Sequence, residues 1–434
     1  MYQAEERIEF TPAMKDEYTI LLPNMLPIHF ELIANVMRQH GYRVELLNNN
    51  GRAIVDEGLK YVHNDTCYPA LMVIGQMISA IKSGDYDTNK LALMMTQTGG
   101  GCRASNYIHL LRKALKKAGY GHIPVISLNF SGLEKNSGFK ITLSMAVKAA
   151  VALLYGDLLM TLRNQVIPYE VHTGSADALT KHWTEALSTS IAKGRVGSVL
   201  GVRKTMNKIV RAYADIPTTG QKKIKVGIVG EIYVKYADFA NNHVADFLLK
   251  QDCEVIIPGL LAFMSFMADV RAEDIRLYGG SRMKLLIFEI VLAFLNRVDR
   301  MLIRAIRKHP KFAAPTTFKE MKPMVSNVVG YGCKMGEGWL LTAEILELIE
   351  SGCENIVCAQ PFGCLPNHIS GKGMIRKVRA LHPNANIVAV DYDPGATKVN
   401  QENRIKLMLS LANEQFEEME GMETENREVC ELIT

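Results

Sequence analysis

Short apolar runs alternate with amphipathic runs along the first third of the chain. The apolar runs are bounded mostly by Gly, Asn or Pro, as expected of strands buried on both faces, and they cover residues 18–25, 42–48, 91–98 and 123–130. Between them, apolar residues recur at three- and four-residue spacing up to a glycine, a common helix end. This alternation predicts a doubly wound parallel sheet, so residues 1–132 are expected to form a first α/β domain.

The pattern changes after this domain. Residues 133–216 have helical periodicity without strands and predict a helical layer or insertion. Residues 217–410 predict a second α/β domain, interrupted by a helical excursion at 260–318, and residues 411–434 predict a C-terminal helix and tail. The expected strands of the second domain cover residues 224–234, 253–259, 327–332, 355–363 and 386–393. The fold class is therefore α/β, with two doubly wound, Rossmann- or flavodoxin-like domains and additional helical segments.

Charge and composition exclude several classes of protein. The chain has 434 residues, 48% of them hydrophobic, and a net charge of +5 with both signs scattered. No arginine-rich stripe with interleaved aromatics is present, so nucleic acid is not an expected partner. The most apolar stretch, residues 285–295, is too short to span a bilayer and contains Glu289, so we expect a buried helix. For the longer helical stretch 285–308 we expect core packing, with a dimer or partner surface as the alternative. Without an apolar leader at the N-terminus, we expect a cytoplasmic protein with no membrane contact.

In that reducing compartment, the eight cysteines should be metal ligands, redox groups or core residues rather than disulfides. Four of them share one context, a loop rich in Gly, Pro or Asn that precedes a helical pattern: Cys67, Cys102, Cys333 and Cys364. The other four occur within apolar strands, after a helix end or in the tail, where a thiol is expected to be structural: Cys253, Cys353, Cys358 and Cys430. Cys358 is the least certain of these, because it lies six residues before Cys364.

The spacing of the four loop cysteines suggests a shared site. Cys67 and Cys102 are 35 residues apart in the first domain, and Cys333 and Cys364 are 31 apart in the second. Each interval holds about one helix and one strand, so each pair is expected on neighbouring loops at the carboxyl end of its sheet. Two loops from each domain, facing each other, would form a four-thiolate site in the cleft between the domains.

An iron–sulfur cluster suits such positions, because helix N-termini favour anions and lower the pKa of a thiol. The glycines at 99–101, 330 and 332 would let backbone N–H groups approach the sulfurs. Zinc is the alternative, although structural zinc sites usually take paired ligands from tight C-x₂₋₄-C knuckles, which the four candidates lack. Four unrelated thiols are the third interpretation that the residues alone leave open.

Several motifs together resemble a known group of proteins. They are HNDTCYPA, QTGGGCRASNY, HTGSADAL, KVGIVGEIYVKY, GYGCKMGEGW, QPFGCLPNHISGKG and DYDPGATKVNQENRIKLML. In combination they resemble the 2-hydroxyacyl-CoA dehydratase superfamily, and within it the branch of acyl-CoA dehydratase activase-related proteins. The resemblance extends from about residue 18 to about residue 410, and its specificity lies in the combination of motifs.

The resemblance implies an oxygen-sensitive cluster, anaerobic electron transfer and a partner. That partner would be an ATP-dependent activase with its own iron–sulfur cluster, which supplies electrons at low potential. This chain lacks the actin-like ATPase part, so a separate activase chain is expected. The residues that match the ligand positions are Cys67, Cys102, Cys333 and Cys364. Four ligands favour one [4Fe-4S] cluster over an [8Fe-9S] double cubane, which would need about six cysteines.

The expected function depends on how many of the cluster's irons are bound by a cysteine of the protein. If all four irons are protein-bound, no iron is open to a substrate, which favours electron transfer over dehydration. The alternatives are a lyase of the 2-hydroxyacyl-CoA dehydratase type or a double-cubane-type reductase that acts on an acyl-CoA or another small substrate, and a zinc-stabilised interaction module. A homodimer remains open as well. The residues expected to line the cleft, without an assigned catalytic role, are Arg103, Ser105, Asn106, Glu231, Glu337 and His368.

Overall fold

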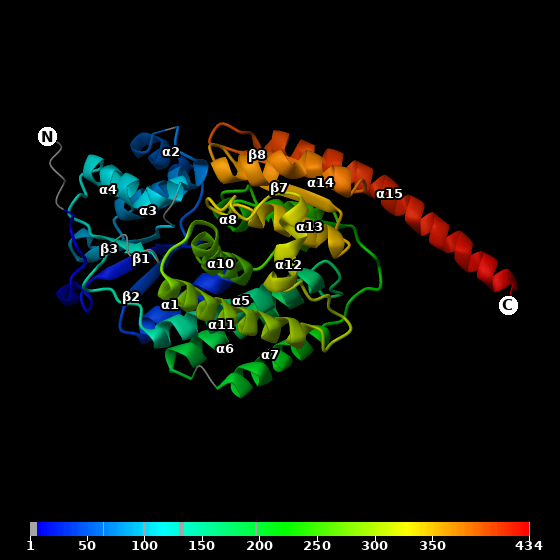
Figure 1. The fold of residues 1–434 in the computed structure, drawn as a ribbon, viewed down its shortest axis with the longest axis horizontal. Coiled ribbons are helices and arrows are strands. Elements are labelled where there is room, and N and C mark those ends of the chain that lie inside the picture. Colours follow the sequence, from blue (N-terminus) through cyan, green and yellow to red (C-terminus); the bar gives the residue numbers. More distant parts are fainter. Residues whose placement is uncertain (1–6, 64, 99–100, 130–133, 196–197, 434) are drawn as a thin grey trace.

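The computed structural model describes the backbone of residues 7–433, with gaps at 64, 99–100, 130–133 and 196–197, and side chains up to residue 418. Two four-stranded sheets, parallel throughout, form its frame (Figure 1). The first has the order β2-β1-β3-β4 and consists of β1 (Thr19–Pro23), β2 (Arg43–Leu47), β3 (Leu91–Thr96) and β4 (Val125–Leu128). The second has the order β6-β5-β7-β8 and consists of β5 (Lys225–Gly230), β6 (Glu254–Ile256), β7 (Asn355–Pro361) and β8 (Asn386–Tyr392). The predicted α/β class with two parallel sheets is confirmed.

Helices cover both faces of each sheet. Those of the first sheet's own crossovers are α1 (Pro27–Gln39), α2 (Arg52–Tyr61), α3 (Tyr68–Lys82) and α4 (Tyr107–Lys117). The second sheet carries α8 (Ile232–Tyr236), α9 (Val244–Lys250), α13 (Leu340–Glu350), α14 (Ile375–Leu381) and α15 (Lys398–Ile433). The remaining helices are α5 (Leu143–Val166), α6 (Ser175–Ala192), α7 (Val199–Ala214), α10 (Leu260–Tyr278), α11 (Arg282–Ile306) and α12 (Phe318–Met324).

Successive side chains of a strand point to opposite faces of the sheet, so each sheet packs against helices on both sides. In β1, Ile20 packs with α1 and α5 on one face of the sheet, whereas Leu21 packs with α3 and α4 on the other. In the second sheet, Ile356 and Val357 divide in the same way. Strands buried on both faces are apolar at nearly every position, which is why the sequence showed them as continuous runs.

The two sheets place their cysteines at equivalent positions. Cys67 precedes the helix α3 that leads into the third strand of the first sheet, and Cys102 follows that strand. Cys333 precedes α13, which leads into the third strand of the second sheet, and Cys364 follows it. The chain order is thus the same in both halves, which directs both cysteine pairs toward the carboxyl ends of their strands, where open α/β sheets bind ligands.

Helix α5 connects the two halves. The buried Asp157 in α5 lies 2.8 Å from His29 Nε2 in α1, and its two oxygens accept the N–H groups of Leu260 and Leu261 at the start of α10, at 2.8 and 2.9 Å. One carboxylate therefore ties the first sheet's helix α1 to the helical excursion of the second half.

Among the described residues, α5 is also the one helix long and apolar enough to cross a membrane. Two thirds of its apolar window (67%) is buried inside the molecule, as is usual for a core helix.

Several sequence predictions differ from the structure. Residues 327–332, expected as a strand, follow the short 3₁₀ turn Val325–Asn327 and continue as turns, because Gly330 and Gly332 interrupt the run while Val325 and Val328 reach the core from the turn itself. The stretch 285–295, expected to be buried, lies in α11 and is largely exposed. At the C-terminal end, α15 continues to Ile433, where a helix and tail were expected.

Candidate functional site

The loops of the four candidate cysteines meet between the two sheets. The Cys67 loop contacts the Cys364 loop: Tyr68 N–H donates to the Phe362 carbonyl at 3.0 Å, and a Cβ on Gly363 would stand 3.2 Å from Cys67 Cα. Because this hydrogen bond joins the first residue of α3 to the end of β7, it links the two halves of the molecule directly.

The other pair of loops is joined in the same way. The Gly101 N–H lies 3.1 Å from Met335 Sδ, which connects the Cys102 loop with the Cys333 loop. A Cβ on Gly336, where φ is +62°, would stand 2.8 Å from Pro366 Cγ and 3.4 Å from Cys102 Sγ. Gly336 therefore permits three loops to approach one another closely, in a backbone conformation that glycine favours.

Three of the four thiols are near enough to affect one another's pKa. Cys67 is 5% exposed and Cys364 is 6% exposed. Burial raises the pKa of the Cys67 thiol, raises the pKa of Cys102 to about 12, and raises the pKa of Cys364 well above its usual range. Cys102 interacts electrostatically with both of the others, so ionisation of one of these thiols disfavours ionisation of the next.

A backbone N–H group acts on the pKa of each of these three thiols. The donors belong to Ala70 for Cys67, to Ala104 for Cys102 and to Asn367 for Cys364, and each lowers the pKa of its thiol against the larger effect of burial. Cys67 Sγ also lies 2.8 Å from the hydroxyl of Tyr107. A thiolate formed at any of the three positions would thus find a hydrogen-bond donor already in place.

Cys333 has a different partner. Its Sγ lies 3.1 Å from Ser370 Oγ, in the single π-helical turn Asn367–Gly371 that follows Cys364. The Cys333 carbonyl accepts the N–H of Trp339 at 2.7 Å, which closes the turn before α13. The structure therefore brings the Cys333 loop to the site, with its thiol held by a residue of the Cys364 loop.

Two buried carboxyl groups lie beside the thiols. Glu231 follows β5 and accepts the N–H of Val234 at 3.0 Å, and Glu337 Oε1 accepts the N–H of Ile232, also at 3.0 Å. Burial and the charge of Glu337 raise the pKa of Glu231 to about 8, and burial raises the pKa of Glu337. Both also raise the pKa of the Cys364 thiol. The two carboxyl groups therefore favour holding a proton near the thiols.

The raised pKa of Glu231 predicts a pH-dependent stability of the metal-free protein. Between its usual value near 4.5 and about 8, the folded protein retains a proton that the unfolded chain has released, so the free energy of unfolding should fall as pH rises through this range. The variant Glu231→Gln should lose this contribution, a difference that denaturant unfolding at about pH 5 and about pH 8.5 would reveal. An unchanged slope would assign the dependence to other buried carboxyl groups, such as Glu344 and Glu347.

The other predicted cleft residues lie on the surrounding loops. Arg103 is exposed, donates to the carbonyl of Asp65 and so connects the two cysteine loops of the first half. Ser105 Oγ donates to the Cys102 carbonyl at 2.7 Å, and the exposed Asn106 begins α4. His368 is exposed, with Nδ1 2.7 Å from Gln360 Nε2. Of the six expected cleft residues, Glu231 and Glu337 are the buried ones.

The remaining cysteines, expected to be structural, are buried where the structure describes them. Cys253 and Cys353 are buried at the opposite, amino-terminal end of the second sheet. Cys358 is fully buried within β7, with Sγ 3.5 Å from Asn367 Oδ1. The side chain of Cys430 and the glycines at 99 and 100 lie outside the described residues, so the predicted roles of these glycines stay predictions.

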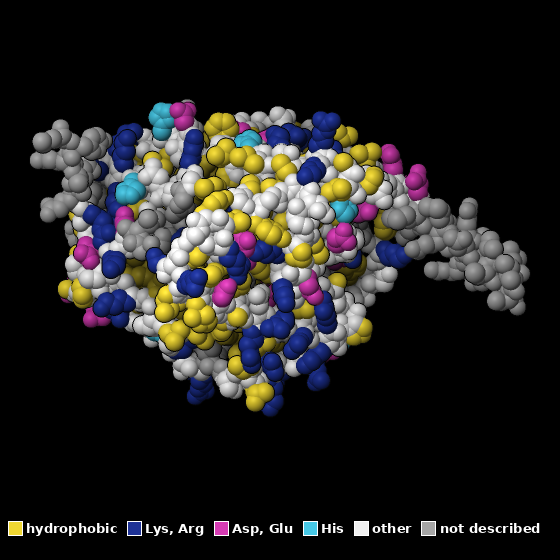
Figure 2. Space-filling model, in the orientation of Figure 1, with side chains coloured by type: hydrophobic (Ala, Val, Ile, Leu, Met, Phe, Trp, Pro, Cys, Tyr) yellow, Lys and Arg dark blue, Asp and Glu magenta, His cyan; other side chains and the backbone are white. Residues whose placement is uncertain are grey.

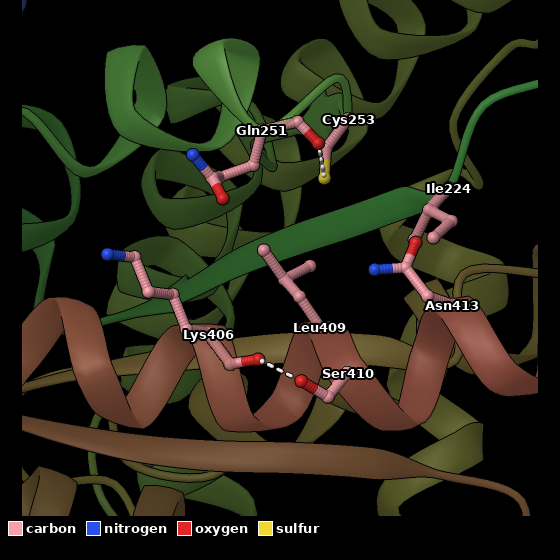
Figure 3. A pocket seen from close by; sticks show the side chains of 7 residues that line it. All are labelled: Ile224, Gln251, Cys253, Lys406, Leu409, Ser410 and Asn413. Carbon is pink, nitrogen blue, oxygen red and sulfur yellow. Dashed lines mark hydrogen bonds between the residues drawn. The ribbon is translucent and has the colours of Figure 1, made fainter.

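A surface depression of about 200 Å³ lies away from the cysteine loops (Figure 3). It is lined by Ile224, Gln251, Cys253, Lys406, Leu409, Ser410 and Asn413. Ile224 precedes β5, so this depression is at the amino ends of the strands, opposite the end where open parallel sheets bind ligands. The cysteine loops are therefore the stronger candidate site.

Sequence reasoning missed three residues that the structure places at or under the site. They are Tyr107, which contacts Cys67, Ser370, which contacts Cys333, and Lys235, which pairs with Glu344 behind the buried carboxyl groups. Lys235 gave a signal, because a lysine inside the apolar segment IYVKY is rarely buried without a counter-charge. The partners of Tyr107 and Ser370 depend on long-range packing and carried no local signal.

Comparison with known proteins does not assign the chain to a family. No protein-family model matches the chain, and no curated protein matches it.

Proposed function

We propose that this chain is an iron–sulfur redox protein related to the 2-hydroxyacyl-CoA dehydratases. It holds a [4Fe-4S] cluster through Cys67, Cys102, Cys333 and Cys364, and it takes low-potential electrons from an ATP-dependent activase. The observation that carries the proposal is the meeting of four cysteine loops, two from each sheet, at the carboxyl ends of the strands. The family is inferred from the combined loop motifs.

The donor set fits a cubane better than a single ion. Among the side chains that the structure describes, no three His, Cys, Asp or Glu residues lie close enough to hold one metal ion. A cubane does not need such a group, because each of its four corners takes one thiolate. Backbone N–H groups at three of the four sulfurs are the kind of donors that stabilise a cluster's thiolates and adjust its potential.

When bound, the cluster would supply one-electron storage at low potential. The chain's own residues would shield it from water, since Cys67 and Cys364 are almost fully buried. The N–H groups of Ala70, Ala104 and Asn367 would stabilise the anionic sulfurs. Glu231 and Glu337 would stay protonated beside the site, so they would add no negative charge next to the anionic sulfurs.

One observation supports a second function, direct action on a substrate. Three thiols form an interacting group, whereas Cys333 Sγ is hydrogen-bonded to Ser370. Ligation by Cys67, Cys102 and Cys364 alone would leave one iron open, as a lyase of the dehydratase type or a reductase requires. The requirement for Cys333 therefore separates electron transfer from catalysis.

The test is anaerobic purification of the chain, followed by iron, sulfide and zinc assays and absorption spectra before and after dithionite. About four irons and four sulfides per chain, with a band near ~400 nm that bleaches on reduction, would support the proposal. About eight irons would favour the double-cubane reductase. A colourless protein that cannot be reconstituted with iron and sulfide would refute it, and one equivalent of zinc would favour the interaction module.

A further inference from the structure

Helix α11 exposes a continuous apolar surface along its first half. All its fully buried residues, from Leu295 to Ile306, belong to its second half. The exposed apolar residues of the first half are Met283, Leu286, Ile287, Ile290, Val291 and Phe294. Leu277 and Tyr278, at the end of α10, are exposed beside them. Figure 2 shows hydrophobic side chains gathered over this end of α11. We call these eight residues the α11 seam.

We propose that the α11 seam pairs with the same seam of a second copy of this chain, giving a two-fold symmetric dimer. The first argument is the spacing. Met283, Ile287, Ile290 and Phe294 follow one another at steps of four, three and four residues. Side chains at this spacing lie on one face of a helix, and such a stripe is typical of a helix that packs along another helix.

The second argument is the size of the surface. The eight side chains are between 36% and 69% exposed. Half-exposed side chains of this size present roughly 800 Å² together, which is about what each partner buries in a standard protein–protein interface. This is larger than the apolar patches that monomeric proteins usually expose. The seam is therefore large enough to hold two copies together.

The third argument concerns charge and fixes the orientation. Beyond the seam, α11 carries the exposed residues Arg297, Arg300 and Arg304, and the neighbouring α7 adds Arg203 and Lys204. Figure 2 shows Lys and Arg side chains gathered in this region. Parallel pairing of two α11 helices would bring the two arginine rows together along their length, whereas antiparallel pairing places them at opposite ends, where only Arg297 comes near the exposed Arg282 and Lys284 of the second copy. The charges therefore favour an antiparallel dimer.

The seam adjoins the cysteine site. Lys334, next to Cys333, forms an ion pair with Asp274 of α10, and its Nζ lies 5.1 Å from the centroid of the Tyr278 ring. A second copy seated on the seam would thus cover the outer side of the Cys333 loop. The dimer itself does not depend on the proposed cluster, since the seam contains no cysteine.

The test is the mass of the full chain in solution, measured by light scattering and sedimentation at micromolar concentrations. The wild type should have twice the chain mass of 48.4 kDa. The double variant Ile287→Glu/Ile290→Glu should be monomeric, with dimer affinity about 100-fold lower or worse, because the added charges would be buried without partners. Both positions are exposed in the monomer, so the variant should fold, which circular dichroism checks.

The matched control is Leu407→Glu on α15, an exposed leucine (69%) outside the seam, which should leave the dimer intact. A monomeric wild type would overturn the proposal, and so would a double variant that remains dimeric. A monomer that floats with phosphatidylglycerol vesicles would assign the seam to a membrane surface instead. For orientation, Ile290→Cys should cross-link to its counterpart in the second copy and Arg304→Cys should not. Cross-linking at both positions would indicate the parallel arrangement and overturn the antiparallel one, and the absence of cross-linking at Ile290→Cys would place the interface elsewhere.

Discussion

Replacing Cys102 by serine should prevent the proposed iron–sulfur cluster from assembling. Cys102 interacts with both Cys67 and Cys364, so its loss breaks the group of three thiols at its centre. Iron content after anaerobic reconstitution should fall from about four per chain to less than one, and the band near ~400 nm should disappear. Cys67→Ser and Cys364→Ser should behave alike.

The informative comparison is Cys333→Ser. If this variant also loses the cluster, Cys333 is a required ligand and all four irons are bound by the protein. No iron would then be open to a substrate, which favours electron transfer. If it keeps about four irons while the other three variants lose theirs, one iron is open and the enzyme alternative is favoured. Cys253→Ser, at the opposite end of the second sheet, is the control and should retain a full cluster. A cluster that survives in all four loop variants would refute the proposed ligand set.

Replacing Lys235 by methionine should destabilise the protein by about 3–5 kcal/mol, because it leaves a buried carboxylate without its counter-charge. Lys235 Nζ lies 2.9 and 3.0 Å from the two carboxylate oxygens of Glu344, and both side chains are almost fully buried. The double variant Lys235→Met/Glu344→Met should recover most of this loss, since buried ion pairs replaced by apolar residues are often neutral.

Urea unfolding of the two single variants and the double variant measures this coupling. The control is Lys82→Met, which breaks the more exposed pair with Glu57 and should change stability by less than about 1 kcal/mol. A Lys235→Met variant no less stable than Lys82→Met would contradict the expectation. Lys235 also lowers the pKa of Glu231 and Glu337, so its loss should make the site's carboxyl groups harder to ionise.

The strands were predictable because the sheets are parallel and covered on both faces. Burial on both sides makes β1, β3 and β7 apolar at most positions, so hydrophobicity alone located them. The same criterion failed at 327–332, where Val325 and Val328 are buried from a turn rather than from a strand. At 327–332 the apolar residues indicated burial correctly, but they did not indicate the backbone conformation that achieves it.

The cysteine loops were predictable for a related reason. Glycine, proline and asparagine mark the breaks between elements, and in an α/β chain these breaks gather at the ends of the sheets. What the sequence did not reveal is the direction of each side chain, such as Cys333 toward Ser370. It also misled at 285–295, because an exposed apolar helix face and a buried one have the same composition.

Helix α5 has a consequence for the proposed electron transfer. Its Asp157 joins α1 to α10 through buried hydrogen bonds, so the separation of the two halves is set by the protein frame as well as by any group between the cysteines. A frame that is already assembled limits how far ligands shift when the charge between them changes. For a centre that gains and loses an electron, this means a small reorganisation energy. The helix that holds the halves together would thereby keep the barrier to each electron transfer low.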